Sequence, residues 1–432
     1  MILPESAEIH DHHLCVGGCD TVDLAQEFGT PLYVFDEATL RNKARAFTRA
    51  FVTRYASVLL CYAAKAFINP WLARLLAEEG FGLDVVSGGE MTIAARAGFP
   101  MAKVHFHGNN KLPVELELAL DLGVGRIVID NFSEIPLLED VARARRTVAE
   151  VLLRIAPGVE AHTHEYLRTG GTYSKFGIPV ATDQAARAVA DIVSCQHLKL
   201  VGFHAHVGSQ IFDLLPFEET VGTLMDFALQ MQERHEFDLL EISPGGGWGI
   251  QYVDADDPPP VEDVAGTIAG VMHHLAAKYK MDLPKLVLEP GRSLVGQAGL
   301  TLYTAGAIKD IPKKRKYVSV DGGMADNVRP ALYQAQYQAL VANKADLCGP
   351  HERVTIAGKY CESGDLLVQD VDLPPIEAGD VIVVPATGAY CIPLASNYNV
   401  SLRPPIVVVK DGQARLVRRR ETIDDLMACE VA

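Results

Sequence analysis

The sequence predicts an α/β protein in two parts: a (β/α)8 barrel of the TIM type and a second domain built from β-strands. Three observations lead to this prediction. Eight short apolar runs between residues 58 and 292 end in polar or glycine-containing segments, and stretches with helical apolar spacing separate them. After about residue 300 the pattern changes to short alternating runs bounded by Gly, Pro and Asp. The chain of 432 residues is long enough to form two domains.

The eight apolar runs are the predicted barrel strands. Segments such as "NPWLARLLAEEG" (69–80) and "PVELELALDLG" (113–123) have helical periodicity, and their terminal glycines are typical helix stops. "DADDPPP" (254–260) is predicted to be a loop that leaves the barrel. Functional groups of such barrels lie where the strands end, which is also where the unusual polar residues of this chain occur. The predicted strands with their tips occupy residues 58–65, 82–90, 104–110, 126–131, 150–158, 200–209, 239–247 and 285–292.

The region after residue 300 is predicted to form the all-β domain, with little helix except near residues 330–341. "PLYVFD" (31–36) has the composition of a further strand of this domain. We expect the barrel to span residues 37–300 and the β domain to comprise residues 1–36 and 301–432. The predicted strands after residue 300 lie at residues 300–311, 316–322, 353–360, 366–373, 380–390 and 404–412.

Charge and composition restrict the partners of the protein. The chain has 39 basic and 55 acidic residues, a net charge of −16, which argues against non-specific binding to nucleic acid or to an anionic membrane. No stretch approaches the roughly 18 consecutive apolar residues of a membrane-spanning helix. "MILPESAEIHDHH" at the N-terminus lacks the pattern of a signal peptide, and eight scattered cysteines favour reduced thiols. We therefore expect a cytoplasmic protein.

Two histidine-containing segments could bind a metal. "HDHHLCVGGC" (10–19) lacks the C-x2-C spacing of zinc sites and has no matching second pair of ligands. His204 and His206 in "GFHAHVGSQ" lie on the same side of a strand, but they lack an obvious third ligand, although "HTH" (162–164) is a candidate. A flat imidazole stacked on a flat cofactor ring explains His206 better. We expect no metal.

Lys65 ends the apolar run "LLCYAAKAF" (59–67). An unpaired ammonium is costly to bury, so the amine either emerges into solvent or serves chemistry. Other strand ends carry further reactive or charged groups: Asp84, His206, Glu289 and Arg292. Their coincidence on one predicted rim favours a chemical role for Lys65.

A glycine run and a charged turn end the last two barrel strands. "SPGGGWG" (243–249) has three consecutive glycines, whose N–H groups can approach a phosphate closely, although tight turns also use glycine. In "EPGRS" (289–293), Glu289 and Arg292 could simply form an ion pair. Alternatively, Glu289 could bind a protonated heterocycle nitrogen, and the planar guanidinium of Arg292 could hold a carboxylate.

Together these groups match the requirements of pyridoxal phosphate. Its aldehyde forms a Schiff base with a lysine, and its pyridinium ring acts as an electron sink. The predicted rim offers an amine, a phosphate cradle with Ser209 beside it, a carboxylate for the ring nitrogen and an imidazole for stacking.

With these motifs in place, the chain resembles the diaminopimelate decarboxylases. This class joins a barrel to a β domain, uses pyridoxal phosphate and also includes ornithine decarboxylase and alanine racemase. The ordered motifs that carry the resemblance, from about residue 30 to 410, are "YAAKAF", "LDVVSGGE", "HGNNK", "HTHEYLRTGGTYSKFGI", "GFHAHVGSQ", "GGGWGI", "EPGRSLV", "RPALY", "CESGD" and "GAYCIPLASNYNVSLRP". Two positions depart from the family pattern, Phe67 after "KA" and Trp248 after the glycine run.

The resemblance implies a role for each matched residue. Lys65 is the Schiff-base lysine, His206 stacks on the pyridine ring and Glu289 pairs with its nitrogen. Cys361 or Lys65 returns a proton to the substrate carbon. The implied cofactor-binding residues are Lys65, Asp84, His206, Ser209, Gly245, Gly246, Gly247, Glu289, Gly291, Arg292 and Tyr390. The implied substrate-binding residues are Arg292, Arg329, Tyr333, Glu362 and Tyr390. Cys361 and Glu362 match a pair supplied by a second subunit, which implies a homodimer whose β domain completes the active site of the partner.

The implied reaction is decarboxylation of meso-2,6-diaminopimelate to L-lysine and carbon dioxide, the last step of lysine biosynthesis by the diaminopimelate pathway. The alternative is a decarboxylase of another basic amino acid, such as ornithine, arginine or a carboxynorspermidine-type substrate. Two arginines count against ornithine, whose distal end has no carboxylate to bind. A non-catalytic regulator would not need "CESGD", and racemases of this class use a tyrosine as their second base.

Overall fold

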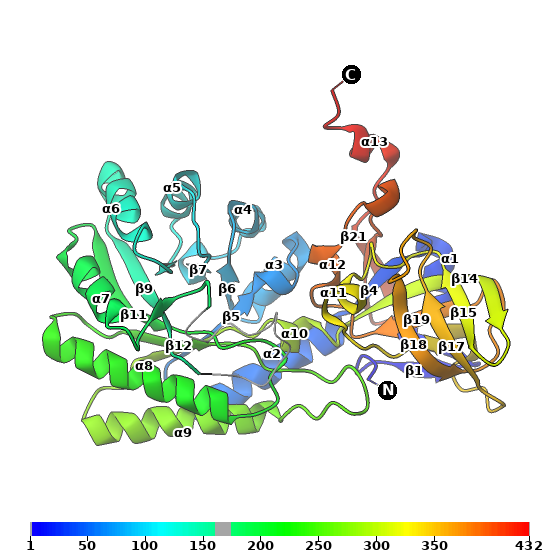
Figure 1. Cartoon of the computed structure of the whole chain (residues 1–432), viewed down its shortest axis with the longest axis horizontal. Coiled ribbons are helices and arrows are strands. Elements are labelled where there is room, and N and C mark those ends of the chain that lie inside the picture. Colours follow the sequence, from blue (N-terminus) through cyan, green and yellow to red (C-terminus); the bar gives the residue numbers. More distant parts are fainter. Residues whose placement is uncertain (1, 160–173, 432) are drawn as a thin grey trace. The chain divides into compact units, whose positions relative to one another are not determined.

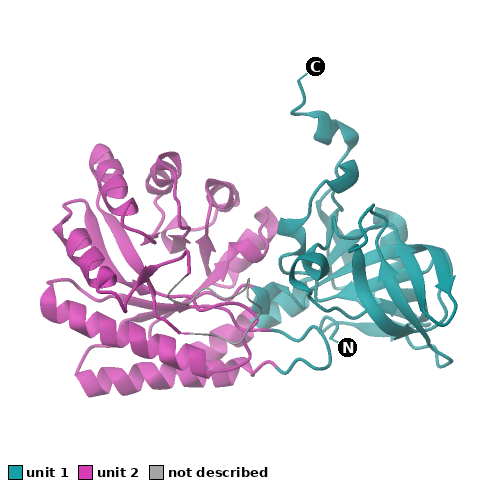
Figure 2. Cartoon of the chain, in the orientation of Figure 1, with its two compact units in different colours: residues 1–43, 250–257, 292–432 teal, residues 44–249, 258–291 magenta. Residues whose placement is uncertain are grey.

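The computed structural model describes residues 2–159 and 174–431, and contacts divide the chain into two compact units (Figures 1 and 2). Unit 1 comprises Met1–Lys43, Ile250–Asp257 and Arg292–Ala432, and unit 2 comprises Ala44–Gly249 and Pro258–Gly291. Residues 162–173, which carry most of the "HTHEYLRTGGTYSKFGI" motif, lie outside the described part of the chain. No helix among the described residues is long and apolar enough to cross a membrane.

Unit 2 contains a closed barrel of eight parallel strands, as the sequence predicts. Pairing of the last barrel strand with the first, and of the fourth with the fifth, closes the sheet. The two-residue strand β10 (Ile178–Pro179) pairs in parallel with the end of β9 and is not one of the eight barrel strands. The barrel strands are β5 (Val58–Ala63), β6 (Gly82–Val85), β7 (Val104–Phe106), β8 (Arg126–Ile129), β9 (Ala149–Ala156), β11 (Leu198–His204), β12 (Glu241–Gly245) and β13 (Lys285–Leu288).

Helices lie around the outside of this barrel (Figure 1). Both helices named from their periodicity are present, and local signals set their ends. Asn69 caps α3 by accepting a hydrogen bond from the Leu72 N–H at 2.9 Å, and Gly123 ends α5 in the left-handed conformation. The helices that follow the barrel strands in this unit are α3 (Pro70–Glu78), α4 (Gly88–Arg96), α5 (Pro113–Leu122), α6 (Glu134–Arg145), α7 (Gln184–Ser194), α8 (Leu215–Arg234) and α9 (Val261–Tyr279).

Unit 1 is built mainly from a β-sheet, as predicted. The N-terminal strand β4 (Leu32–Asp36), expected from "PLYVFD", lies between β14 (Gly299–Ile311) and β20 (Ile406–Lys410). The long β14 also pairs with both β15 and β19. The other strands of the sheet are β15 (Arg315–Val320), β16 (Leu340–Val341), β17 (Glu352–Ala357), β18 (Leu366–Leu373), β19 (Val381–Pro385) and β21 (Gln413–Arg418).

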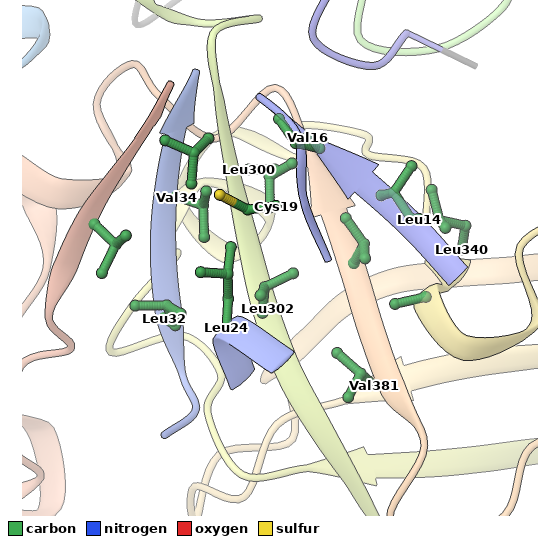
Figure 3. Close-up of a cluster of buried hydrophobic side chains, with 14 residues drawn as sticks. Leu14, Val16, Cys19, Leu24, Leu32, Val34, Leu300, Leu302, Leu340 and Val381 are labelled. Carbon is green, nitrogen blue, oxygen red and sulfur yellow. The ribbon is translucent and has the colours of Figure 1, made fainter. Parts of the chain in front are cut away.

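The histidine-rich N-terminal segment folds into a small antiparallel sheet of β1 (Glu8–His10), β2 (His13–Val16) and β3 (Cys19–Asp20). The sequence analysis did not predict these strands. Leu14 and Val16 of β2 enter the core of unit 1 beside residues of β4 and β14 (Figure 3). Burying each such side chain stabilises the folded protein by about 1.5–3 kcal/mol. The N-terminal segment therefore contributes to the stability of this core.

Candidate active site

Lys65 lies immediately after β5, at the C-terminal end of the barrel. The short 3-10 helix Ala64–Ala66 turns the chain here, and its two alanines are buried while Lys65 is exposed. Burial raises the pKa of the carboxyl groups of Asp84 in β6 and Glu90 in α4, and the nearby Lys65 ammonium acts against this rise in both. The strand therefore presents an accessible amine beside two acids.

Glu289 follows β13 and is buried. Its Oε2 accepts a hydrogen bond from His204 Nε2 at 3.0 Å, and its Oε1 accepts one from Ser243 Oγ at 3.0 Å. A third group, His107 Nε2, lies 3.4 Å from Oε1. Three strand ends thus hold one carboxylate in a fixed orientation.

The neighbours of Glu289 keep it ionised. Burial by itself would raise the pKa of this carboxyl, but His204 and His107 beside it hold the pKa well below its ordinary value. In nearby Asp84, burial and the Glu289 charge raise the pKa well above its ordinary value. Burial and charge therefore act on the two acids in opposite net directions, lowering the pKa of Glu289 and raising that of Asp84.

His107, His204 and Glu289 also satisfy a simple criterion for a metal site. One ligand atom from each lies within 4.8 Å of the others, and all three residues are buried. The His204 nitrogen and both carboxylate oxygens already take part in the hydrogen bonds described above.

The glycine run turns back against His206 and Glu289. Gly245 and Gly247 have φ values of +78° and +117°, which favour glycine. A Cβ on Gly246 would come within 2.0 Å of the Glu289 carbonyl oxygen, so no side chain fits there. The Gly246 N–H donates to His206 Nδ1 at 3.3 Å.

His206 presents a neutral ring. Burial, together with the charges of Lys65 and Arg154, lowers the pKa of this imidazole well below its ordinary value. The ring can therefore stack on an aromatic cofactor without bringing a second positive charge near a protonated heterocycle. Ser209, the expected phosphate ligand, is half-buried two residues before the bridge between Ile211 and Trp248.

The two departures from the family pattern are core residues. Trp248 is buried with its ring 5.6 Å from Phe47 and 5.8 Å from Phe217, so it anchors the glycine run on the surrounding helices. Phe67 is buried, and its carbonyl accepts a hydrogen bond from Tyr62 at 2.7 Å.

The expected substrate-binding residues lie in unit 1. Arg292 and Arg329 are both buried, and the Arg292 guanidinium lies 4.8 Å from the ring centroid of Tyr390. Tyr390 has a φ of +66° at the start of the short helix Cys391–Leu394. Tyr333 ends α11 (Arg329–Tyr333) and is half-buried.

Cys361 and Glu362 lie in a separate, exposed part of unit 1. Glu362 accepts a hydrogen bond from Tyr398, whose ring lies 6.0 Å from that of Tyr360.

The expected site residues are divided between the two units. Unit 2 holds Lys65, Asp84, His206, Ser209, Gly245, Gly246, Gly247, Glu289 and Gly291, and unit 1 holds Arg292, Arg329, Tyr333, Cys361, Glu362 and Tyr390. The sequence analysis assigned no role to His107, His204 or Ser243. Each lies in or just beyond a barrel strand, and this position alone does not distinguish it from a core residue.

The residues of unit 2 fit pyridoxal phosphate. An exposed amine, an ionised buried carboxylate, a neutral imidazole and a glycine turn that admits no Cβ lie at the ends of β5, β11, β12 and β13. Gly291 also brings the chain against β5, because its Cβ would lie 3.0 Å from that of Ala63. These groups correspond to the aldehyde, ring nitrogen, ring face and phosphate of the cofactor.

Comparisons with known proteins agree with this chemistry. Residues 37–296 match the family model for the pyridoxal binding domain of pyridoxal-dependent decarboxylases. The diaminopimelate decarboxylase of Bacillus subtilis is 45% identical over 100% of this chain and 98% of its own length. The enzyme of the same name from Halalkalibacterium halodurans is also 45% identical, over 97% of this chain and 95% of its own.

Solved structures give the same result. The diaminopimelate decarboxylase of M. jannaschii in complex with L-lysine has a TM-score of 0.94 and 36% sequence identity, with 100% of this chain and 99% of that chain covered. Sequence and structure therefore place this chain in the diaminopimelate decarboxylase family of pyridoxal-dependent decarboxylases.

Proposed function

We propose that this protein decarboxylates meso-diaminopimelate to L-lysine and carbon dioxide with pyridoxal phosphate as cofactor, the last step of lysine biosynthesis by the diaminopimelate pathway. The observation that carries the proposal is Glu289, a buried carboxylate held ionised at the C-terminal end of the barrel, where Lys65 presents an exposed amine. The full-length similarity to diaminopimelate decarboxylases selects the substrate.

Lys65 would hold the aldehyde carbon of the cofactor through its Nζ. His206 would cover one face of the ring, and Gly245, Gly246, Gly247, Ser209 and Tyr390 would hold its phosphate. When bound, pyridoxal phosphate supplies a conjugated, electron-withdrawing ring that accepts the electron pair released when the Cα–carboxylate bond breaks. The protein's own task is to position that bond and to control protons.

Glu289 controls the proton on the ring nitrogen. An ionised carboxylate at that position stabilises the protonated nitrogen, and hydrogen bonds from His204 and Ser243 prevent it from rotating away. Glu289 would thereby keep a bound ring protonated and strongly electron-withdrawing.

Cys361 or Lys65 would return the proton to Cα after carbon dioxide leaves. Lys65 has the required exposure next to the other cofactor groups. Cys361 and Glu362 are both exposed on unit 1, which supports a homodimer in which they act in the partner's site.

Binding of the distal end of the substrate would distinguish diaminopimelate from other basic amino acids. The distal end of diaminopimelate is an amino acid, so its binding requires cations for a carboxylate and an anion for an ammonium. Arg292 and Arg329 offer the first, with Tyr333 beside Arg329 in the same helix, and Glu362 offers the second. Ornithine and arginine have no distal carboxylate, which disfavours them as substrates.

The cysteine and charge content of the chain supports a cytoplasmic location and a small-molecule substrate. All eight cysteines are free thiols, which agrees with a reducing cytoplasm. The net charge of −16 argues against nucleic acid as a partner.

Carbon dioxide release by the purified protein with added pyridoxal phosphate tests the proposal. The substrates are meso-diaminopimelate, its LL isomer, ornithine and arginine. Release from the meso compound alone is expected. Release from ornithine or arginine would keep the cofactor chemistry but refute the substrate, and no release from any of the four would refute the function.

A further inference from the structure

Arg329 is buried in unit 1 among neutral groups. Its Nη1 donates a hydrogen bond to the hydroxyl of Tyr337, and its guanidinium lies 4.9 Å from the ring centroid of Tyr252 and 5.5 Å from that of Tyr337. Within the described part of the chain, no carboxylate forms a salt bridge with Arg329. A buried guanidinium of this kind retains an uncompensated positive charge.

Tyr252 connects the two arginines. Arg292 Nη1 donates to the Tyr252 hydroxyl at 2.6 Å, while the face of the same ring lies against Arg329. The rings of Tyr252 and Tyr337 meet edge to face with centroids 5.3 Å apart. One aromatic pair therefore fixes both guanidinium groups.

The Tyr337 hydroxyl is itself fixed by a chain of hydrogen bonds. It accepts from Arg329 and lies 3.5 Å from Cys391 Sγ, and Cys391 in turn donates to Asn327 Oδ1 at 3.4 Å. The same Asn327 oxygen accepts the backbone N–H of Arg329 at 3.3 Å, which closes the chain into a ring. Arg329 is thus held at both its backbone and its guanidinium.

The protonation states agree with this arrangement. Burial raises the pKa of the Tyr337 hydroxyl well above its ordinary value, although Arg329 acts in the opposite direction. Burial by itself would lower the pKa of the Arg329 guanidinium, but Tyr252 and Tyr337 beside it raise that pKa. The arginine is therefore charged and the phenol neutral.

We propose that Tyr252 and Tyr337 are positioning residues that hold Arg292 and Arg329 for the distal carboxylate of the substrate, and so determine the preference for a two-ended amino acid. A neutral phenol can orient a guanidinium without neutralising it, whereas a carboxylate partner would compete with the substrate. This inference rests on the proposed function. It adds two residues to the chemistry of substrate selection that do not touch the reacting carbon.

The test compares two ligands of the cofactor-loaded enzyme by calorimetry. L-lysine, the product, retains the distal carboxylate, and cadaverine is the same molecule without it. In Tyr252→Phe and Tyr337→Phe, affinity for L-lysine is expected to fall by about 10- to 100-fold, the usual effect of a lost hydrogen bond to a charged group. Affinity for cadaverine is expected to stay at the wild-type value.

Tyr303→Phe is the matched control. Tyr303 is a fully buried tyrosine of unit 1 whose hydroxyl has no hydrogen-bond partner among the described residues, so removing it tests the general effect of deleting a buried phenol. It is expected to leave both affinities unchanged. Steady-state kinetics give a second readout, in which KM for meso-diaminopimelate rises in the two variants while kcat is retained.

Two outcomes would overturn the inference: unchanged L-lysine affinity in both variants, or an equal loss for L-lysine and cadaverine, which marks a purely structural role. Failure of the proposed function has a different signature. In that case the wild-type enzyme would not prefer L-lysine over cadaverine and would not decarboxylate the meso compound.

Discussion

Glu289 and His204 form a buried hydrogen bond of 3.0 Å between Oε2 and Nε2, and this contact fixes the carboxylate that we propose for the cofactor ring nitrogen. Replacement of Glu289 by Gln keeps the shape but removes the negative charge. The kcat for meso-diaminopimelate is expected to fall by about 10²- to 10³-fold, the usual effect of removing one preorganised electrostatic partner. Steady-state assays at saturating cofactor measure it.

Glu233→Gln, on the exposed surface of α8, is the control for the same chemical change and is expected to be fully active. A Glu289→Gln enzyme with wild-type kcat would show that the carboxylate charge has no role in the reaction.

Lys65→Ala removes the amine at the end of β5. The visible absorption band that appears when pyridoxal phosphate is added to the wild-type protein is expected to be absent, because no other group would hold the cofactor aldehyde. Absorption spectra of the two proteins with equal added cofactor provide the measurement. Lys278→Ala, on the exposed side of α9, is expected to keep the band, and a band in Lys65→Ala would refute the assignment.

Hybrid dimers test whether Cys361 acts in the partner's site. Lys65→Ala and Cys361→Ala are each expected to be nearly inactive alone. If the two residues meet across subunits, equal mixing yields half heterodimers with one intact site each, and about a quarter of wild-type activity returns. If the two residues act within one subunit, mixing restores nothing, which is the result that would contradict the shared site.

Much of the predicted barrel site could be found from sequence because Lys65 and Glu289 are charged residues at the ends of apolar runs, where charged side chains are uncommon. Lys65 is an amine at the end of an apolar run, and Glu289 is a charge after another such run. Each anomaly is visible without knowledge of the fold, and the strand–helix repeat then places both on one rim.

His204 and Tyr252 could not be found in this way. A histidine inside an apolar strand has the same local pattern whether it supports Glu289 or merely fills the core. Tyr252 gains its role from Arg329 and Tyr337, which are far from it in sequence and meet it only after folding. Likewise, "HDHHLCVGGC" gave no strand signal because turn residues separate its short apolar parts.

Gly246→Ala tests the glycine turn. A methyl group there would lie within 2.0 Å of the Glu289 carbonyl oxygen, so the turn must shift and move both the phosphate cradle and Glu289. We expect a loss of about 1–3 kcal/mol in the free energy of unfolding. Cofactor affinity is expected to fall at least tenfold, about 1.4 kcal/mol of binding free energy. Equilibrium unfolding and cofactor titration measure the two effects.

Gly270→Ala in α9 is the matched control, because nothing lies within 4 Å of the added Cβ. Alanine favours the helix, so this variant is expected to be stabilised by about 0.5–1 kcal/mol with unchanged cofactor affinity. Equal cofactor affinity in both variants would show that the turn does not bind the phosphate.

Asp326 predicts a pH dependence of stability in unit 1. Burial raises the pKa of this carboxyl from 3.8 to about 7, although the Gly323 N–H at 2.8 Å lowers it. Because the folded-state pKa lies above the unfolded one, the folded protein binds the extra proton. The associated stability is complete below about pH 4 and is lost as the pH rises through about 7. A shift of this size corresponds to roughly 4 kcal/mol.

Asp326→Asn stays uncharged at every pH, so its free energy of unfolding is expected to decrease less between pH 5 and pH 8 than that of the wild type. Urea unfolding at the two pH values gives the comparison, and the contributions of all other titrating groups cancel in the difference. Asp424→Asn, at an exposed position, should follow the wild type. If the stability of Asp326→Asn changes with pH as that of the wild type does, then Asp326 is already ionised at pH 5. The hydrogen bond from the Gly323 N–H would in that case be enough to stabilise a charged carboxylate in this core.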